Sequence, residues 1–295
     1  MMYLNKCNLC PHMCLVDRKN KKRGFCKSGE NVKIALSSKF FYEEPCISGT
    51  KGSGAVFFSN CNLRCVYCQN YKISKDGKGK EISIKELADI FLDLQEEGVH
   101  NINLVTPTIY ALQIKEALIL AKKNGLNIPI IYNSSGYENV DTIKELDGFI
   151  DVYLPDFKYC SNELGLKYSG VNKYFDFASR AILEMYRQVG QPLLDENGIM
   201  KKGLMIRHLI LPNEIENTKE VLKWIKQNLD NKVFVSIMAQ YFPTYMAKNV
   251  EKLNRKLTLQ EYQAIEDFVF SLDLENGYMQ DLGEHEEEYV PKWEF

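Results

Sequence analysis

The sequence predicts an α/β fold of about six strand–helix units that follow a cysteine-rich N-terminal extension. Short β-type runs alternate with amphipathic helical patterns from Gly54 onward, whereas residues 1 to about 53 carry five of the nine cysteines with little periodic apolar pattern. The chain has 295 residues, of which 45% are hydrophobic and 26% charged. This composition provides a sizeable core and excludes general disorder.

The strands are expected where apolar, aromatic and β-branched residues run together between turn residues. The expected runs cover residues 55–58, 102–105, 128–132, 149–154, 204–211 and 233–238. Pro129 removes one hydrogen-bond donor from the third run, which leaves the start of that strand open.

Helical patterns lie between these runs. Ser83 and Glu86 form a capping box ahead of apolar residues at helical spacing, and Thr258 and Glu261 form another. Further helices are expected over residues 111–124, 139–147, 173–188 and 217–229. The repeated order of strand and helix predicts parallel strands with right-handed crossovers, an order that both an open doubly wound sheet and a partial barrel satisfy.

Charge and hydropathy exclude several classes of partner. With 37 basic and 39 acidic residues the formal net charge is −2, which gives no global electrostatic reason to expect nucleic acid or an anionic membrane. The aliphatic run over residues 117–121 is far shorter than the ~20 residues that cross a bilayer, and residues 1–7 do not resemble a secretory signal. We therefore expect a cytoplasmic protein and, without a coiled-coil pattern, a monomer.

The sharpest motif is the C-x3-C-x2-C group of Cys61, Cys65 and Cys68, directly after the first expected strand. Structural zinc normally takes four ligands, and a fourth cysteine is not close by. An iron–sulfur cube held by three cysteines would keep one iron open to another ligand. A zinc knuckle or a set of buried thiols is the alternative. The loop after a barrel strand is also where active sites of such folds are built.

This motif resembles that of the radical S-adenosylmethionine (SAM) superfamily. The longer string from Gly54 to Asn70 is similar to the pyruvate formate-lyase activating enzyme group, especially its uncharacterised branch. The resemblance implies a partial (β/α)6 TIM-like barrel over residues 54–275, and a [4Fe-4S] cluster on the three cysteines whose fourth iron binds SAM. One electron would then cleave SAM to methionine and a 5′-deoxyadenosyl radical, which abstracts a hydrogen atom from a substrate.

The resemblance leaves the partners less defined than the chemistry. It implies an electron donor such as flavodoxin or ferredoxin. The substrate is either a glycyl radical enzyme, which this protein would activate, or a small molecule or peptide that is modified directly. A non-catalytic metal-binding or electron-transfer protein is a further alternative, although six strand–helix units are more scaffold than an electron carrier needs.

Nine further positions resemble sites that contact SAM in the superfamily, with ordinary core packing, polar turns or surface ion pairs as the alternatives. They are Tyr67, Thr106, Thr108, Asn133, Ser135, Asp156, Lys158, His208 and Met238. The chain has Thr106-Pro107-Thr108 where the superfamily often has Gly-Gly-Glu, so hydroxyl and backbone acceptors would have to bind the SAM amine there.

The N-terminal extension has four cysteines in the pattern C-x2-C-x3-C-x11-C. Cys7, Cys10, Cys14 and Cys26 could close a tetrahedral zinc site or hold a second iron–sulfur cluster, and the spacing does not decide between these or the absence of a metal. His12 could substitute for one ligand. Cys46 and Cys160 are isolated and are interpreted as small hydrophobic residues. Residues 276–295 are expected to form a C-terminal tail.

Overall fold

The computed structural model describes residues 4–274, 276–283, 291 and 293. Its centre is a mixed sheet with the strand order β10-β9-β8-β6-β5-β4-β2-β1-β3, and β7 pairs with β8 off this path. The strands are β1 (Val32–Phe40), β2 (Ser53–Phe58), β3 (Lys80–Ile82), β4 (Ile102–Val105), β5 (Ile130–Ser134), β6 (Val152–Pro155), β7 (Leu193–Leu194), β8 (Met200–Leu209), β9 (Phe234–Met238) and β10 (Gly277–Met279).

Most of the sheet is parallel. Every neighbouring pair from β2 across to β10 runs parallel, whereas β1 is antiparallel to both β2 and β3. In the described part of the chain β3 and β10 remain at the two edges, so the sheet curves without closing. This is the α/β partial barrel that the sequence predicts, with β2, β4, β5, β6, β8 and β9 as its six strands.

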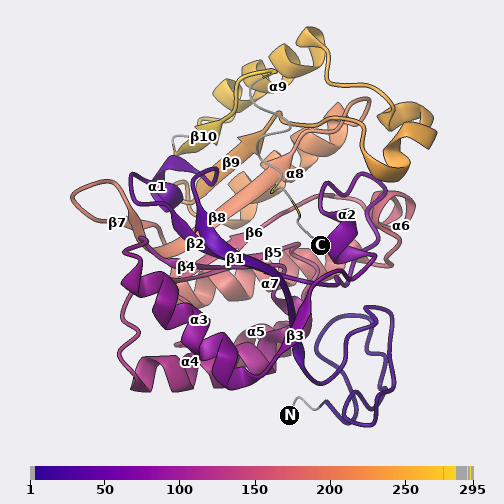
Figure 1. The fold of residues 1–295 in the computed structure, drawn as a ribbon. Coiled ribbons are helices and arrows are strands. Elements are labelled where there is room, and N and C mark those ends of the chain that lie inside the picture. The colour runs from indigo at the N-terminus through magenta and orange to yellow at the C-terminus, as the bar shows by residue number, and fades with distance from the viewer. Residues whose placement is uncertain (1–3, 275, 284–290, 292, 294–295) are drawn as a thin grey trace.

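Helices follow the strands and pack on the outside of the curved sheet, where Figure 1 shows α3, α4 and α5 on one flank and α8 and α9 on the other. The α-helices are α1 (Pro45–Ser48), α2 (Tyr71–Ser74), α3 (Ile84–Glu96), α4 (Ala111–Lys123), α5 (Val140–Glu145), α6 (Asn162–Ser169), α7 (Tyr174–Val189), α8 (Ile215–Asn228) and α9 (Leu259–Ser271). Short 3-10 helices span η1 (Thr108–Tyr110), η2 (Tyr245–Asn249) and η3 (Glu251–Leu253). Within the described residues, no helix is long and apolar enough to span a membrane.

Both predicted capping boxes are confirmed. The Ser83 side chain accepts a hydrogen bond from the Glu86 amide, and the Glu86 carboxylate accepts one from the Ser83 amide. Thr258 and Glu261 repeat this arrangement at the start of α9. These reciprocal bonds satisfy amides that have no partner inside the helix, which is why both helices begin at these residues.

Strand β1 is the main element that the sequence analysis did not predict. Residues 32–40 were assigned to the extension because they lack a clean alternating pattern, and most of their side chains are only partly buried. They nevertheless pair with both β2 and β3. The short helices α1, α2 and α6 and the strands β3, β7 and β10 were also not predicted. The domain boundary at residue 53 stays a prediction, and much of the expected tail over residues 276–295 lies outside the described residues.

One end of the barrel interior is filled with apolar side chains. Helix α1 contributes Cys46 and Ile47 to a buried cluster with Ile131, Leu154 and Met205 from three barrel strands. Asn101 anchors α1 by donating a hydrogen bond to the Ile47 carbonyl at 2.8 Å. The interior is therefore closed at this end, and the space inside the barrel opens at the carboxyl ends of the strands.

Candidate active site at the carboxyl ends of the strands

A cavity of about 530 Å³ lies at the carboxyl ends of the parallel strands, where barrel folds build their active sites. Ten of the residues predicted to bind a cluster or SAM line it. They are Cys61, Cys65, Tyr67, Cys68, Thr106, Asn133, Ser135, Asp156, Lys158 and Met238. Residues from five different loops and strand ends thus meet at one place, although up to 177 positions separate them in the sequence.

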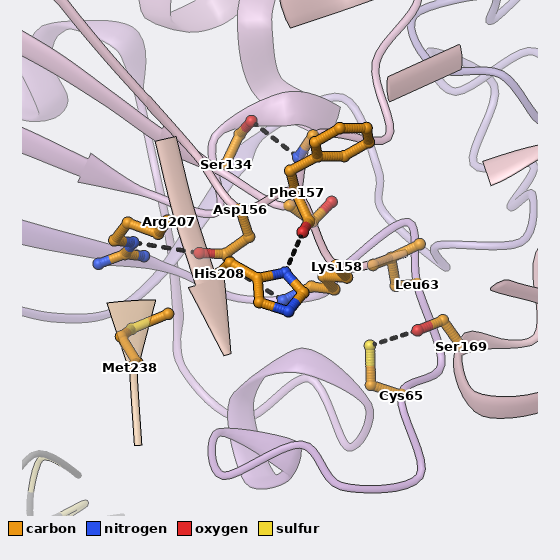
Figure 2. Close-up of polar contacts among 12 residues, drawn as sticks. Leu63, Cys65, Ser134, Asp156, Phe157, Lys158, Ser169, Arg207, His208 and Met238 are labelled. Carbon is orange, nitrogen blue, oxygen red and sulfur yellow. Dashed lines mark hydrogen bonds and ion pairs between the residues drawn. The ribbon is translucent and has the colours of Figure 1, made fainter. Parts of the chain in front are cut away.

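The three cysteines lie on the loop that follows β2, and the end of α6 holds this loop. The amides of Arg64 and Val66 donate to the carbonyls of Ser169 and Tyr168 at 2.9 and 2.8 Å. Cys65 Sγ lies 3.0 Å from Ser169 Oγ, a contact that Figure 2 shows. The loop therefore presents its sulfur atoms from a backbone that is fixed to a neighbouring helix.

The environment of these thiols disfavours the thiolate form in the protein alone. Burial and the nearby Cys65 raise the pKa of Cys61 to about 12, and the same causes raise the pKa of Cys68 to about 11. Burial also raises the pKa of Cys65, although the charge of Lys158 opposes this shift. Three buried thiolates would need a positively charged group among them, which a metal cluster provides.

The donor chemistry fits an iron–sulfur cluster better than a single metal ion. Among the described residues, no three His, Cys, Asp or Glu side chains are arranged as the ligands of one ion. A cluster does not require such convergence, because each of its irons takes its own thiolate. Asn70 Oδ1 and Ser135 Oγ also line the cavity and are buried without a hydrogen-bond partner, as expected of groups that bind a polar ligand.

Four charged side chains form a network on the cavity wall. Arg207 donates to Glu43 Oε2 at 2.9 Å, to Asp156 Oδ1 at 3.1 Å and to Asn133 Oδ1 at 2.7 Å. Lys158 donates to the second oxygen of Asp156 at 2.7 Å. Figure 2 shows Arg207 directed at Asp156, with Lys158 on the side of Cys65. Positive and negative groups alternate, so each buried charge has a partner of opposite sign.

The pKa values of the two carboxyl groups in this network reflect two opposing effects, burial and pairing with positive charges. Burial raises the pKa of Glu43 to about 7, although the charge of Arg207 opposes this. Burial would also raise the pKa of Asp156, but the charges of Lys158 and Arg207 outweigh it and hold that pKa below its ordinary value. Asp156 is therefore the ionised carboxylate of the network near neutral pH.

Arg207 and Glu43 were not among the predicted site residues. Glu43 lies in the loop between β1 and α1, outside any motif, and strand geometry explains the position of Arg207. Successive side chains on a strand point to opposite faces, so Arg207 faces the cavity and the adjacent His208 faces outward. His208 Nδ1 contacts the Phe157 carbonyl at 2.6 Å and Nε2 contacts Thr218 Oγ1 at 2.9 Å. Burial lowers the pKa of His208 to about 4. His208 is thus a neutral residue of the outer core that does not line the cavity.

Thr108 also does not line the cavity. It lies in η1, and its hydroxyl donates to Glu138 Oε1 at 2.6 Å. Its neighbour Thr106, which has a left-handed backbone (φ 62°), does line the cavity. The Thr-Pro-Thr segment therefore brings a single threonine to the site.

The Tyr67 side chain belongs to a hydrogen-bonded chain below the cysteine loop. Its hydroxyl lies 2.5 Å from that of Tyr159, which lies 2.9 Å from Ser169 Oγ, the group that contacts Cys65. The hydroxyl is thus occupied within the protein, and the ring borders the cavity. An aromatic contact between this ring and adenine stays a prediction.

The turn after β5 requires a glycine. Gly136 has φ of +73°, and a Cβ atom there would lie 2.5 Å from the Asp156 carbonyl oxygen. Only glycine permits this backbone conformation and this approach without strain. The close approach sets the end of β5 against the end of β6, which carry Ser135 and Asp156 respectively.

The four N-terminal cysteines line a second buried cavity, which shares no residue with the first. His12 is not among the residues around it. Its ring stacks on Phe25 with centroids 3.8 Å apart, and Nε2 contacts the Asn62 carbonyl at 2.9 Å. The structure therefore brings the four predicted cysteines together and uses His12 for a contact with the cysteine loop of the first cavity.

Comparison with known proteins agrees with this geometry. A family model described as the radical SAM superfamily matches residues 55–225. The chain is 35% identical over 288 residues to an uncharacterised protein of Methanocaldococcus jannaschii, which covers 94% of this chain and 76% of that protein. It is 26% identical over 219 residues to the pyruvate formate-lyase-activating enzyme of Clostridium pasteurianum, with 72% and 84% covered.

Solved structures show the same fold. SuiB of Streptococcus suis bound to S-adenosylmethionine aligns with a TM-score of 0.52 at 18% identity, covering 80% of this chain. SuiB bound to its precursor peptide SuiA aligns with a TM-score of 0.54 at 16% identity, covering 79% of this chain. The present chain spans about half the length of the SuiB chains, 51% and 48% respectively.

Proposed function

This chain belongs to the radical SAM superfamily, and from that premise we propose that Cys61, Cys65 and Cys68 hold a [4Fe-4S] cluster with which the enzyme abstracts a hydrogen atom from a protein substrate. The single observation that carries this proposal is the meeting of the three thiols with orphaned polar atoms in one cavity at the carboxyl ends of the strands. Three thiolates leave one iron free for the amine and carboxylate of SAM.

The cofactors supply the difficult chemistry: when both are bound, an electron from the cluster cleaves SAM to methionine and a 5′-deoxyadenosyl radical. The chain supplies binding, orientation and shielding. Lys158 offers its ammonium group to a carboxylate beside the cysteine loop. Ser135 and Asn133 offer hydroxyl and amide groups, and Met238 offers an apolar surface on the opposite wall.

The protein also keeps the chemistry away from water. Cys61 is buried and Cys65 and Cys68 are partly buried where they border the cavity, and the packed layer around α1 closes the barrel interior at the opposite end. This shielding suits a reactive radical, which must meet its substrate before it meets solvent.

A protein substrate is supported by the relative named as an activating enzyme and by the mouth of the cavity. Phe41 and Tyr42 line the cavity and remain 53% and 48% exposed. An apolar rim of this kind suits an inserted peptide segment better than a small, highly charged molecule. Within this class we propose glycyl radical activation, in which a glycine α-hydrogen is the atom removed. Flavodoxin or ferredoxin is the proposed electron donor.

Reductive cleavage of SAM tests the chemistry. After anaerobic reconstitution with iron and sulfide, dithionite and SAM should give 5′-deoxyadenosine and methionine, measured by chromatography. Cys65→Ala should reduce this product at least 100-fold, because one iron loses its thiolate. Cys160→Ala is the matched control, since Cys160 is a partly exposed thiol outside the cavity. Equal product from Cys65→Ala and Cys160→Ala would rule out the proposed cluster ligands.

Isotope transfer tests the substrate class. A glycyl radical enzyme from the same organism, labelled with [α-²H]glycine, should transfer deuterium into 5′-deoxyadenosine and acquire a glycyl radical signal in electron paramagnetic resonance (EPR). A reconstituted enzyme that cleaves SAM but transfers no deuterium from this partner would refute activation and retain the radical chemistry.

A further inference from the structure

The N-terminal cysteines form a separate buried centre. Cys7, Cys10, Cys14 and Cys26 line one cavity of about 10 Å³, and Cys7, Cys10 and Cys26 are each less than 10% exposed. Apolar side chains complete the lining, among them Leu9 and Ile109 at 1% exposure. Four thiols thus surround one small space, in which three of them are buried and Cys14 is partly exposed.

The size of this space argues against a single zinc ion. A cavity of about 10 Å³ accommodates about one water-sized sphere, so a sulfur that borders it lies roughly 3 Å or more from its centre. A zinc–sulfur bond is only about 2.3 Å long. In the described residues no three such side chains have the arrangement of ligands to one ion. A cluster is compatible with thiols that do not converge on one point, because each thiolate binds a different iron.

Arg18 is a buried positive charge beside this centre, and it also lies over the Tyr110 ring, 5.6 Å from the centroid. Its side chain is 2% exposed, and Nη1 lies 4.0 Å from Cys7 Sγ while donating to the Ile109 carbonyl at 2.7 Å. Nη2 is buried without a hydrogen-bond partner, and none of the ion pairs of the described residues includes Arg18. A buried guanidinium without an anion is costly. A cluster held by four thiolates would provide that anion.

We propose that Cys7, Cys10, Cys14 and Cys26 hold a second iron–sulfur cluster, closed by four thiolates, that passes electrons to the Cys61–Cys68 loop. Because all four ligands would come from the protein, no iron of this cluster would be free to bind SAM. Its function would therefore be electron transfer. One electron enters from a reduced flavodoxin- or ferredoxin-type carrier, which is oxidised by that electron, and leaves toward the loop. No bond is made or broken at the four cysteines.

Direct contacts join the two cysteine groups. The Phe25 amide donates to Cys14 Sγ at 3.4 Å, and the Phe25 carbonyl accepts a hydrogen bond from Arg64, the neighbour of Cys65. The Arg64 guanidinium also lies over the Phe25 ring, 4.4 Å from its centroid. His12 makes the second connection through the Asn62 carbonyl, next to Cys61. The centre is therefore packed directly against the loop that it would serve.

Iron analysis of a variant that lacks the first cluster tests the assignment. After anaerobic reconstitution, the triple variant Cys61→Ala, Cys65→Ala, Cys68→Ala should retain about two or about four irons per chain with an equal number of sulfides. The unsubstituted chain should hold about four more of each. The triple variant should also keep a broad absorbance band and give an EPR signal when reduced by dithionite. One zinc per chain, or no metal, in a folded triple variant would overturn the second cluster.

The proposed electron transfer from the second cluster to the first (the relay) rests on the proposed function, whereas the presence of the second cluster does not. In the double variant Cys10→Ala, Cys26→Ala, formation of 5′-deoxyadenosine driven by reduced flavodoxin should fall at least 10-fold more than formation driven by dithionite, which is small enough to reduce the first cluster directly. Equal losses with both reductants would refute the relay. Failure of SAM cleavage in the unsubstituted chain would instead refute the proposed function.

The effect of the Arg18 charge on the midpoint potential of the second cluster can be measured without any catalytic assay. Within the triple variant, Arg18→Met should make the midpoint potential of the remaining cluster more negative, because a nearby positive charge stabilises the reduced form. Arg18→Lys should retain most of the original potential. An EPR redox titration that gives the same potential for Arg18→Met and the parent would refute the role of Arg18 as the counter-charge.

Discussion

At the scale of single residues, Arg207 holds together the charges of the active-site cavity. Its side chain is 15% exposed and contacts both Glu43 and Asp156, which come from elements far apart in the sequence. Among the ion pairs of the described residues, Glu43 has Arg207 as its partner, whereas Asp156 is also paired with Lys158. Arg207 therefore contributes to the shape of the site through two ion pairs that share one guanidinium.

Replacement of Arg207 should destabilise the protein strongly. We expect Arg207→Met to lower the free energy of unfolding by about 3 kcal/mol. It leaves the buried Glu43 carboxylate without its ion-pair partner and removes one of the two cations that pair with Asp156. Urea denaturation followed by circular dichroism measures this loss. Arg187→Met is the matched control, since Arg187 also bridges two carboxylates but is 57% exposed, and it should cost less than ~1 kcal/mol. Similar losses in the two variants would contradict a buried network.

Glu138 should make the stability depend on pH. It is fully buried, and burial raises its pKa to about 8. The folded state therefore keeps a proton that the unfolded state loses above its ordinary pKa of 4.5. The stability that this proton contributes is complete below that value and is lost as the pH rises through about 8.

The variant Glu138→Gln should remove this dependence. Between pH 5.5 and 7.5 the unsubstituted protein should lose up to about 3 kcal/mol relative to the variant, at about 1.4 kcal/mol per pH unit. Denaturant unfolding at the two pH values measures the difference. Glu145→Gln, at an exposed ion pair with Lys115, should leave the pH dependence unchanged. Parallel pH profiles for the parent and Glu138→Gln would show that Glu138 is ionised in the folded state.

At the scale of elements, the cysteine loop depends on helix α6. Ser161 caps the start of α6 by accepting from the amides of Glu163 and Leu164, and Gly170 ends the helix in a left-handed conformation. The carbonyls of Tyr168 and Ser169 at this end receive the amides of the loop. A short helix that the sequence pattern did not indicate thus sets the position of the proposed cluster ligands.

The capping box of α3 offers a test on an element whose start the sequence predicts. Ser83→Ala should lower the free energy of unfolding by about 1 kcal/mol, because the Glu86 amide loses its acceptor at the helix start. The midpoint of urea denaturation measures this change. Thr50→Ala, at an exposed position outside helices and strands, should change stability by less than ~0.5 kcal/mol. A loss no larger than that of the control would mean that the box does not stabilise α3.

At the scale of the whole molecule, the barrel divides its interior into a packed end and a functional end. The apolar cluster with α1 fills one end, and the charged network and the cysteine loop line the other. Binding at the functional end would connect loops from many strands. A ligand that occupies the cavity should therefore stabilise the entire domain.

The reconstituted protein should accordingly become more heat-stable with SAM. At a SAM concentration of 100 times its dissociation constant, linkage gives about 2.7 kcal/mol, which corresponds to a rise in Tm of roughly 5 °C for a domain of this size. Anaerobic differential scanning calorimetry measures the rise. The triple variant of Cys61, Cys65 and Cys68 is the control and should show less than half of it. An equal rise in both proteins would place SAM away from the cysteine loop.

Local patterns were sufficient for the order of the six barrel strands and for the main motif. The six strand runs, both capping boxes and the cysteine spacing each depend on residues within a few positions of one another, so the sequence displays them directly. Strand β1 was missed because its side chains do not alternate clearly. It becomes a strand through pairing with β2 and β3, which the sequence does not display.

The sequence by itself predicts a repeating α/β fold and a loop whose three thiols bind a cluster. Both predictions are possible because secondary-structure periodicity and ligand spacing are local properties. Only the tertiary structure shows that Arg207, and not His208, lines the cavity and that Glu43 lies beside it. Only the tertiary structure also shows that the N-terminal cysteines pack beside the cysteine loop. These outcomes depend on strand register and on contacts between residues far apart in sequence, whose energies no local pattern contains.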